Sequence, residues 1–184
     1  MDASGAEQIS KLMSSNATQK KDERRNGEVD SSQYTKVVEF LLNTKHFVVD
    51  LYGVKEIVQC VGITKLPNTP QHIHGIIDIR GQITTVIDPK KYLKIASTRD
   101  SNIGKCKIIV LDEERTGTKV GMLVDEVVAV TAYSKEDINT SIAIDSSSYI
   151  KGVIEKIKPG ANEEEEDKIE LIVWIEISRF MEEL

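Results

Sequence analysis

The sequence predicts an all-β protein with short helices, built as two small barrels that share one hydrophobic core. Short runs rich in β-branched and other apolar residues recur at close spacing, with turn-forming residues between them. The order of these runs repeats in the two halves of the chain. Each half is too small for a stable core of its own, and short, closely spaced strands favour barrels over an open sheet.

The amino-acid composition limits the kinds of partner that the protein can bind and indicates where in the cell it is located. The chain has 184 residues, 40% of them hydrophobic and 29% charged, which is enough for one domain with a core. Its formal net charge of −6 argues against a nucleic-acid partner, which needs a concentrated basic face. No run approaches the ~18 apolar residues of a transmembrane helix, and the polar N-terminus is unlike a secretory signal. We therefore expect a cytoplasmic protein that does not insert directly into a membrane.

A polar segment precedes the folded domain. We expect residues 1–33 to form a flexible tail, with a docking peptide as the alternative, and residues 34–184 to form the domain. The first apolar runs, 37–42 and 47–51, flank turn-forming residues and predict a β-hairpin. Residues 52–58 fit either a helical turn or a turn followed by a strand.

The most distinctive stretch begins with two prolines, in residues 66–70, which preset the backbone of a loop. Residues 75–80 then alternate as a strand does, so that Ile77 and Ile79 point to one face. A tight turn is expected next at Gly81, because glycine takes a positive φ at little steric cost.

A returning strand and a short helix complete this stretch. Residues 83–87 are rich in β-branched side chains and should pair antiparallel with the strand before them. Asp88 then caps a helix that has Pro89 at its first position. Further β segments are expected at 61–66, 107–111, 119–124, 126–132, 149–157 and 168–175, and a final helix at 178–184. Loops and turns are expected at 96–104, 112–117, 134–148 and 158–167, the last of which holds four successive glutamates at 163–166.

The two halves of the chain correspond segment by segment. Residues 54–58 match 127–130, residues 75–78 match 152–155, and residues 85–88 match 173–176. The last match precedes a predicted helix in both halves. This repeat indicates two related β subdomains that pack against each other.

Motifs for catalysis are missing. The sequence has no phosphate-cradling loop, no dinucleotide fingerprint, no serine-nucleophile elbow and no H-E-x-x-H motif. We therefore predict no catalytic residue and no cofactor. His72 and His74 have ligand-like spacing, and Asp78 or Asp88 could add a carboxylate, so a small metal-dependent enzyme is an alternative hypothesis. The simpler interpretation is that His72 and His74 are exposed and bind no metal. The third histidine, His46, lies near a predicted hairpin turn and has no evident partner in the sequence.

The chain has two cysteines, Cys60 and Cys106. They share no C-x-x-C spacing, which argues against a zinc site or a redox pair. We expect two small, buried, apolar side chains in a reducing cytosol. Asp125 and Glu126 are expected to form a polar turn between two strands.

From about residue 37 onward, the chain resembles the CheW family of chemotaxis coupling proteins. The matching motifs are Leu-Pro-Asn-Thr-Pro at 66–70, Gly-Ile-Ile-Asp-Ile-Arg-Gly at 75–81, Val-Ile-Asp at 86–88 and Gly-Met-Leu-Val-Asp-Glu-Val at 121–127. Their order and spacing together are specific for the family. Asp78 stands where the family usually has Asn.

The resemblance implies two intertwined SH3-like β-barrels, each of five strands, around a common core. It also implies a non-catalytic scaffold that couples the cytoplasmic hairpin tips of chemoreceptors to the CheA histidine kinase in membrane-associated receptor arrays. The regulatory domain of that kinase has the same fold, so similar barrels can meet at their ends. A coupling protein of a non-chemotactic pathway, such as surface motility, is an alternative that the residues do not separate.

The resemblance also implies a receptor-facing set of residues, carried over by motif: Val54, Glu56, Ile57, Gly75, Arg80, Ile108 and Val130. An apolar face of the receptor hairpin would lie in a groove between the barrels. Arg80 would bind a carboxylate or a carbonyl at the edge of that groove, or, alternatively, would pair with Asp78. Gly75 would let a neighbouring backbone approach, or would mark a strand start or bulge. No residues are assigned to the kinase.

Overall fold

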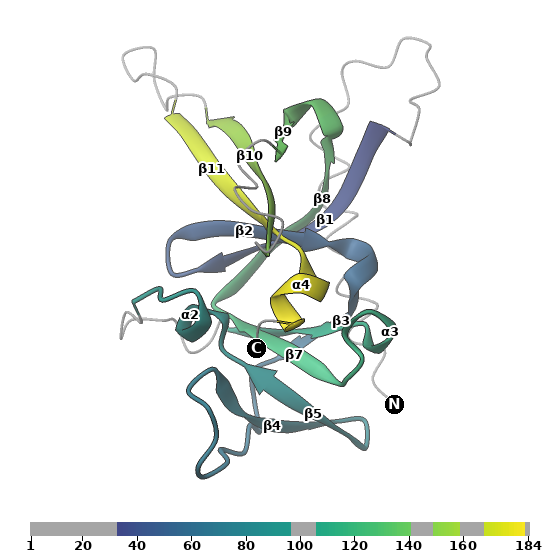
Figure 1. The fold of residues 1–184 in the computed structure, drawn as a ribbon, viewed down its shortest axis with the longest axis vertical. Coiled ribbons are helices and arrows are strands. Elements are labelled where there is room, and N and C mark those ends of the chain that lie inside the picture. Colours follow the sequence, from purple (N-terminus) through teal and green to yellow (C-terminus); the bar gives the residue numbers. More distant parts are fainter. Residues whose placement is uncertain (1–32, 97–105, 141–148, 159–167, 183–184) are drawn as a thin grey trace.

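The computed structural model describes residues 33–96, 106–140, 149–158 and 168–182 (Figure 1). The expected tail up to residue 32 and the glutamate run 163–166 lie outside these ranges. Within them the chain forms two β-sheets with a few short helices, as the sequence predicts. None of the helices in these ranges is both long enough and apolar enough to span a lipid bilayer.

One sheet is built from the middle of the chain, and we call it the middle barrel. Its strand order is β3-β6-β7-β5-β4. Its strands are β3 (Val54–Gln59), β4 (Ile73–Ile79), β5 (Gln82–Ile87), β6 (Lys107–Leu111) and β7 (Val120–Val124). It also carries helix α2 (Pro89–Tyr92), which Asp88 caps by accepting a hydrogen bond from the Lys90 N–H. The predicted charged turn at 112–117 contains a short helix, α3 (Glu113–Thr116).

The other sheet joins both ends of the described chain, and we call it the terminal barrel. Its strand order is β8-β1-β2-β11-β10-β9. Its strands are β1 (Tyr34–Leu42), β2 (Lys45–Asp50), β8 (Glu126–Ser134), β9 (Ile138–Asn139), β10 (Ile150–Lys158) and β11 (Lys168–Ile175). The predicted five strands are joined here by β9, a two-residue sixth strand. Short 3-10 turns follow β2 (Leu51–Gly53) and β8 (Lys135–Asp137), and α4 (Ile177–Glu182) follows β11.

The repeat predicted from the sequence is confirmed by the strand pairing. Strands β3, β6, β7, β5 and β4 correspond in order to β8, β1, β2, β11 and β10, and the β5–β7 and β11–β2 pairs are both parallel. Gly75 pairs with Val86, and its counterpart Gly152 pairs with Trp174; a β-bulge precedes both glycines. The first hairpin of the chain thus completes the barrel of its second half, which intertwines the two units.

A short segment closes each barrel by pairing with the strand that carries the β-bulge, which is β4 in the middle barrel and β10 in the terminal barrel. In the middle barrel the predicted β segment 61–66 contributes a single bridge, in which Thr64 and Ile76 exchange two backbone hydrogen bonds of 2.8 and 2.9 Å. In the terminal barrel the predicted loop 134–148 contains β9, which pairs with Val153 and Ile154. The rest of that predicted loop, residues 141–148, lies outside the described residues.

Three apolar clusters match this architecture. The largest holds side chains from both sheets, including Phe40 and Ile109, together with Phe180 from α4, and is the shared core that the sequence predicts. A cluster around Trp174 fills the terminal barrel, and a cluster around Ile108 fills the middle barrel. Figure 1 shows α4 between the two sheets, where it seals the shared core.

Candidate functional site

The turn between β4 and β5 presents Arg80 to solvent. Both turn residues have positive φ, 52° at Arg80 and 79° at Gly81, which is the backbone of a type I′ hairpin turn. The sequence predicts this for Gly81 but not for an arginine, because a left-handed backbone costs a residue with a Cβ roughly 1–2 kcal/mol. Asp78 stabilises the turn, since its Oδ1 accepts a 2.7 Å hydrogen bond from the Gly81 N–H. The turn therefore holds Arg80 in a fixed place.

Glu56 on β3 pairs with Arg80. Arg80 Nη2 lies 3.2 Å from Glu56 Oε2, and the Arg80 side chain is 62% exposed. This pair takes the place of the Arg80–Asp78 pair that the sequence left as an alternative. The Glu56 carboxylate is nearly buried, and its Oε2 atom accepts no hydrogen bond within the described residues. This oxygen has almost no exposed surface, and the Arg80 guanidinium is the charged group that faces it.

A shallow hollow of about 170 Å³ surrounds the pair. It is lined by side chains of both edge strands and of β5, β6 and α3, among them Lys55, Ile79, Thr84, Val110 and Lys119. Apolar side chains and charges of both signs thus meet around Arg80. Such a surface suits contact with another protein better than binding of a small apolar ligand.

The other residues of the predicted receptor-facing set lie beneath or beside this surface. Ile57 and Val130 occupy corresponding positions of the repeat and are buried in the shared core. Ile108 is buried in the core of the middle barrel, and Val54 is half-buried against the shared core. The structure therefore brings Glu56 and Arg80 together, and it places Ile57 and Val130 in the shared core and Ile108 in the core of the middle barrel.

Gly75 lies where β4 meets the closing segment of the middle barrel. A Cβ at this position would overlap the carbonyl oxygen of Thr64. The bulge between Ile73 and Gly75 is the alternative that the sequence offered for this glycine. The backbone that approaches Gly75 closely is therefore that of Thr64 in the same chain, and Gly75 itself is buried.

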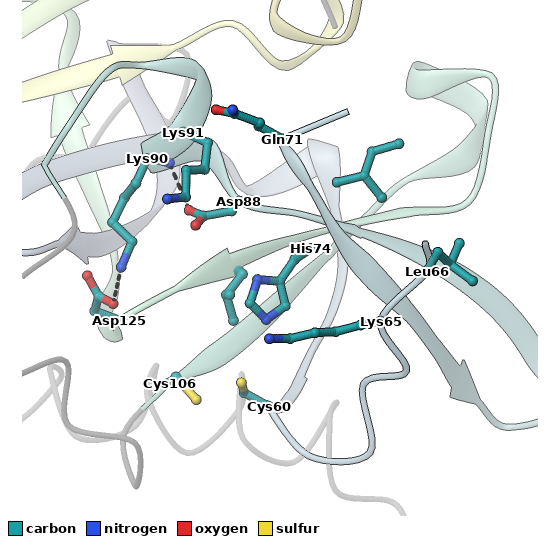
Figure 2. A pocket seen from close by; sticks show the side chains of 12 residues that line it. Cys60, Lys65, Leu66, Gln71, His74, Asp88, Lys90, Lys91, Cys106 and Asp125 are labelled. Atoms are coloured by element: carbon teal, nitrogen blue, oxygen red, sulfur yellow. Dashed lines mark hydrogen bonds and ion pairs between the residues drawn. The ribbon is translucent and has the colours of Figure 1, made fainter. Parts of the chain in front are cut away.

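A second, larger cavity of about 570 Å³ lies between β3, β4, β6 and α2 (Figure 2). His74 faces it, and burial lowers the pKa of His74. The Asp88 carboxylate opposes this shift, and Lys65, Lys90 and Lys91 add smaller lowering effects. Lys90 extends to Asp125, and its Nζ lies 2.7 Å from Asp125 Oδ1. The expected polar turn at Asp125 is thereby fixed to α2.

The two cysteines meet on the wall of this cavity, which the sequence does not predict. Cys60 and Cys106 are both half-buried, and their side chains are hydrogen-bonded to each other. Burial, and then the hydrogen bond and charge of Cys106, raise the pKa of Cys60 to about 12. The sequence predicts two small, buried side chains; the structure shows both half-buried, and the β3–β6 register, which sequence spacing does not reveal, brings them together.

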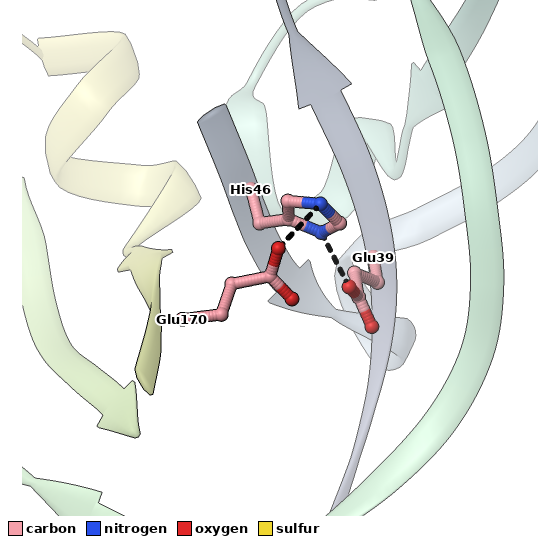
Figure 3. A group of neighbouring side chains, drawn as sticks. All are labelled: Glu39, His46 and Glu170. Carbon is pink, nitrogen blue, oxygen red and sulfur yellow. Dashed lines mark hydrogen bonds and ion pairs between the residues drawn. The ribbon is translucent and has the colours of Figure 1, made fainter. Parts of the chain in front are cut away.

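His46 has two partners that the sequence does not reveal (Figure 3). Its Nδ1 lies 2.6 Å from Oε1 of Glu39, and its Nε2 lies 3.1 Å from Oε1 of Glu170. Glu39 is 1% exposed, and it also accepts a 3.1 Å hydrogen bond from the Tyr133 hydroxyl. Burial, and then Glu39, raise the pKa of Tyr133. Nδ1 and Nε2 face different carboxylates, so the imidazole ring bridges Glu39 and Glu170.

The metal hypothesis for His72 and His74 gains no support from this geometry. Among the described residues, the metal-type donors that lie within 4.8 Å of one another are those of Glu39, His46 and Glu170. The predicted pair is not part of that group.

Two joined barrels with an exposed arginine over a polar hollow define a protein-binding scaffold. The family model of the CheW-like domain matches residues 36–183, and the chain therefore belongs to the CheW-like family. It is a scaffold protein of chemotaxis and not an enzyme.

Individual relatives agree with this assignment. The chain is 28% identical over 131 residues to chemotaxis protein CheW of Treponema pallidum, which covers 68% of this chain and 75% of the relative. With CheW of Thermotoga maritima it shares 22% identity over 156 residues, covering 84% and 93%. The crystal structure of scaffolding protein TtCheW from Thermoanaerobacter tengcongensis matches with a TM-score of 0.63 and 26% identity, covering 82% of this chain and 90% of that one.

Proposed function

We propose that this protein couples the cytoplasmic hairpin tips of chemoreceptors to the histidine kinase CheA. It would act in the cytoplasm and be recruited to membrane-associated receptor arrays. The observation that carries the proposal is Arg80, which the β4–β5 turn holds at the surface in a backbone conformation that arginine rarely adopts. Such conformations often persist at functional positions.

The receptor would bind at the Arg80–Glu56 hollow. Arg80 would donate hydrogen bonds to a carboxylate or backbone carbonyl of the receptor tip, and Glu56 would hold the guanidinium in position for it. Val54 would add a half-buried apolar contact. The buried members of the predicted set, Ile57, Ile108 and Val130, would shape this surface from below without touching the receptor.

The kinase would bind at a different surface, on the terminal barrel. Ile157 and Ile169 are cross-strand partners on β10 and β11, and Leu171 follows on the same face; their exposed fractions are 66%, 65% and 58%. In the repeat, Ile157 corresponds to Arg80. The CheA regulatory domain of the family has the same fold, so an apolar barrel end of the kinase would match this one.

A co-sedimentation assay with receptor arrays and CheA tests the proposal. The protein should enter the pellet and change kinase autophosphorylation. A protein that does neither would not be a chemotaxis coupler. The named relatives point to chemotaxis and do not favour surface motility; if receptors of a motility system pulled down the protein in place of chemoreceptors, that pathway would be the correct one.

A further inference from the structure

Strand register places the two cysteines face to face. In the antiparallel β3–β6 pair, Val58 lies opposite Ile108 and Gln59 lies opposite Lys107. The next position on each strand is Cys60 on one side and Cys106 on the other. Residues directly opposite in an antiparallel pair have Cβ atoms about 4.5–5.5 Å apart, close to the separation that a disulfide needs.

Side-chain geometry supports the same relationship. The two thiols are hydrogen-bonded to each other, and Figure 2 shows their sulfur atoms turned toward one another at one side of the cavity. Both residues lie at the end of a ladder, where the backbone can adjust more readily than in the middle of a sheet. Bond formation would therefore need only a small local movement.

Small reagents can reach this pair. Both side chains are half-buried and line the cavity of about 570 Å³ together with His74, Lys65 and Gln71. A cysteine packed only for volume would be sealed from solvent, as Ile108 is two residues along the chain from Cys106. We propose that Cys60 and Cys106 are a redox modification site, a dithiol that a peroxide converts reversibly to an intramolecular disulfide.

The proposed reaction is balanced with one peroxide. The Cys106 thiol loses its proton, and the thiolate sulfur attacks one peroxide oxygen. The O–O bond breaks, Cys106 becomes a sulfenic acid, and the other oxygen leaves as hydroxide, which takes up the proton released by Cys106 and becomes water. The Cys60 sulfur then attacks the Cys106 sulfur, the S–O bond breaks, and the oxygen leaves as a second water with the Cys60 proton. Two thiols and one hydrogen peroxide thus give one disulfide and two waters, and an external dithiol reverses the change.

The order of these steps follows from the surroundings of Cys60. Burial and the neighbouring Cys106 hold the Cys60 proton, because they raise the pKa of its thiol to about 12. A thiol that keeps its proton is a poor nucleophile, so the first attack is assigned to Cys106. Oxidation of Cys106 to a neutral sulfenic acid removes the thiolate charge beside Cys60, which makes the second step easier.

The disulfide would tie the end of β3, the strand that carries Glu56, to the start of β6. A covalent link between these strands removes conformational freedom from the unfolded chain and should raise the melting temperature. This inference concerns chemistry within one chain and does not depend on the identity of the partners.

Oxidation of the full-length, reduced protein tests the inference. The chain should be treated with hydrogen peroxide, then denatured, and its intact mass and free thiols measured, with non-reducing electrophoresis beside them. We expect loss of two hydrogens per chain, loss of both free thiols, a monomeric band and a higher melting temperature, all reversed by dithiothreitol. The variant Cys60→Ser should instead gain oxygen on Cys106, while Cys106→Ser, which keeps only the protonated Cys60 thiol, should gain oxygen more slowly.

Other outcomes would overturn the inference. These are oxygen gain on both cysteines of the wild-type protein, disulfide-linked dimers, or thiols that stay reduced when the same peroxide fully oxidises the single-cysteine variants. The measurement on wild-type protein decides the matter even if a variant fails to fold.

Discussion

The Arg80 guanidinium lies 3.2 Å from the Glu56 carboxylate and joins β4 to β3, the two edge strands of the middle barrel. The pair spans the side at which this barrel closes. It leaves the guanidinium largely in solvent, so its electrostatic contribution to folding is small, while its position is well defined. These are the properties expected of a group retained to bind a partner.

Arg80→Gly should change stability very little. The variant loses an ion pair whose arginine is largely solvated, worth roughly 0.2–1 kcal/mol, and relieves a left-handed backbone that costs about 1–2 kcal/mol. Urea unfolding should therefore give an unfolding free energy within about 1 kcal/mol of the wild type. A loss of several kcal/mol would show that Arg80 is mainly a structural residue.

Gly75→Ala should destabilise the middle barrel. The new methyl group would overlap the Thr64 carbonyl oxygen, and we expect a loss of about 1–3 kcal/mol in urea unfolding. Gly152→Ala is the matched control, because Gly152 holds the corresponding position of the repeat and its Cβ would lie 3.1 Å from the Asn139 carbonyl oxygen. An equal or greater loss in the control would contradict the close-approach argument.

His46→Ala should cost roughly 3–5 kcal/mol of unfolding free energy, because it removes a partner of the buried Glu39 carboxylate. In the repeat, Glu39 corresponds to Val110 of the middle barrel. The double variant Glu39→Val with His46→Ala should therefore recover part of the loss. Thermal or urea unfolding of both variants measures this, and additive losses would be inconsistent with a coupled pair.

His74 should make stability depend on pH. Burial lowers its pKa in the folded state below the ordinary value of 6.5, so the unfolded chain binds a proton at a higher pH than the folded one. The stability present above about pH 6.5 is then lost as the pH falls through the folded pKa. As the pH is lowered, the unfolding free energy should fall more steeply in the wild type than in His74→Gln. Parallel curves would contradict a His74 pKa that burial lowers.

The proposed kinase surface can be tested apart from the receptor surface. Ile169→Lys places a charge in the exposed patch on β11 and should weaken CheA binding by roughly tenfold or more, as loss of a central interface contact does. Receptor binding should be unchanged. Isothermal titration with the isolated CheA regulatory domain measures the loss of CheA binding. If the variant binds the domain normally, the kinase contact must lie on another surface.

Much of the fold could be predicted from the sequence, because its signals are local. Alternation in β4, the cap at Asp88 and the repeated glycines Gly75 and Gly152 indicate strands, a helix start and two related units. The contacts between distant side chains could not be predicted. Cys60 and Cys106 are neighbours only because of the β3–β6 register. The pairing of Glu39 with His46 was likewise not predictable, although a glutamate within the apolar run 37–42 is unusual.

The candidate site was predicted as a set of positions but not as a surface. Family positions single out Glu56 and Arg80 without showing that they pair, since β3 and β4 come together only when the barrel closes. The same positions include Ile57, Ile108 and Val130, and sequence alone does not show that these are buried. Burial depends on the packing of both barrels, which no single segment encodes.

Receptor co-sedimentation of the Arg80→Ala variant tests the central claim most directly. Lys36→Ala, which removes an exposed positive charge from β1 of the terminal barrel, is the matched control. If Arg80 binds the receptor tip, Arg80→Ala should pellet with receptor arrays at least about tenfold more weakly than the wild type, while the control pellets normally. A folded Arg80→Ala variant that binds receptor arrays as tightly as the wild type would contradict the claim.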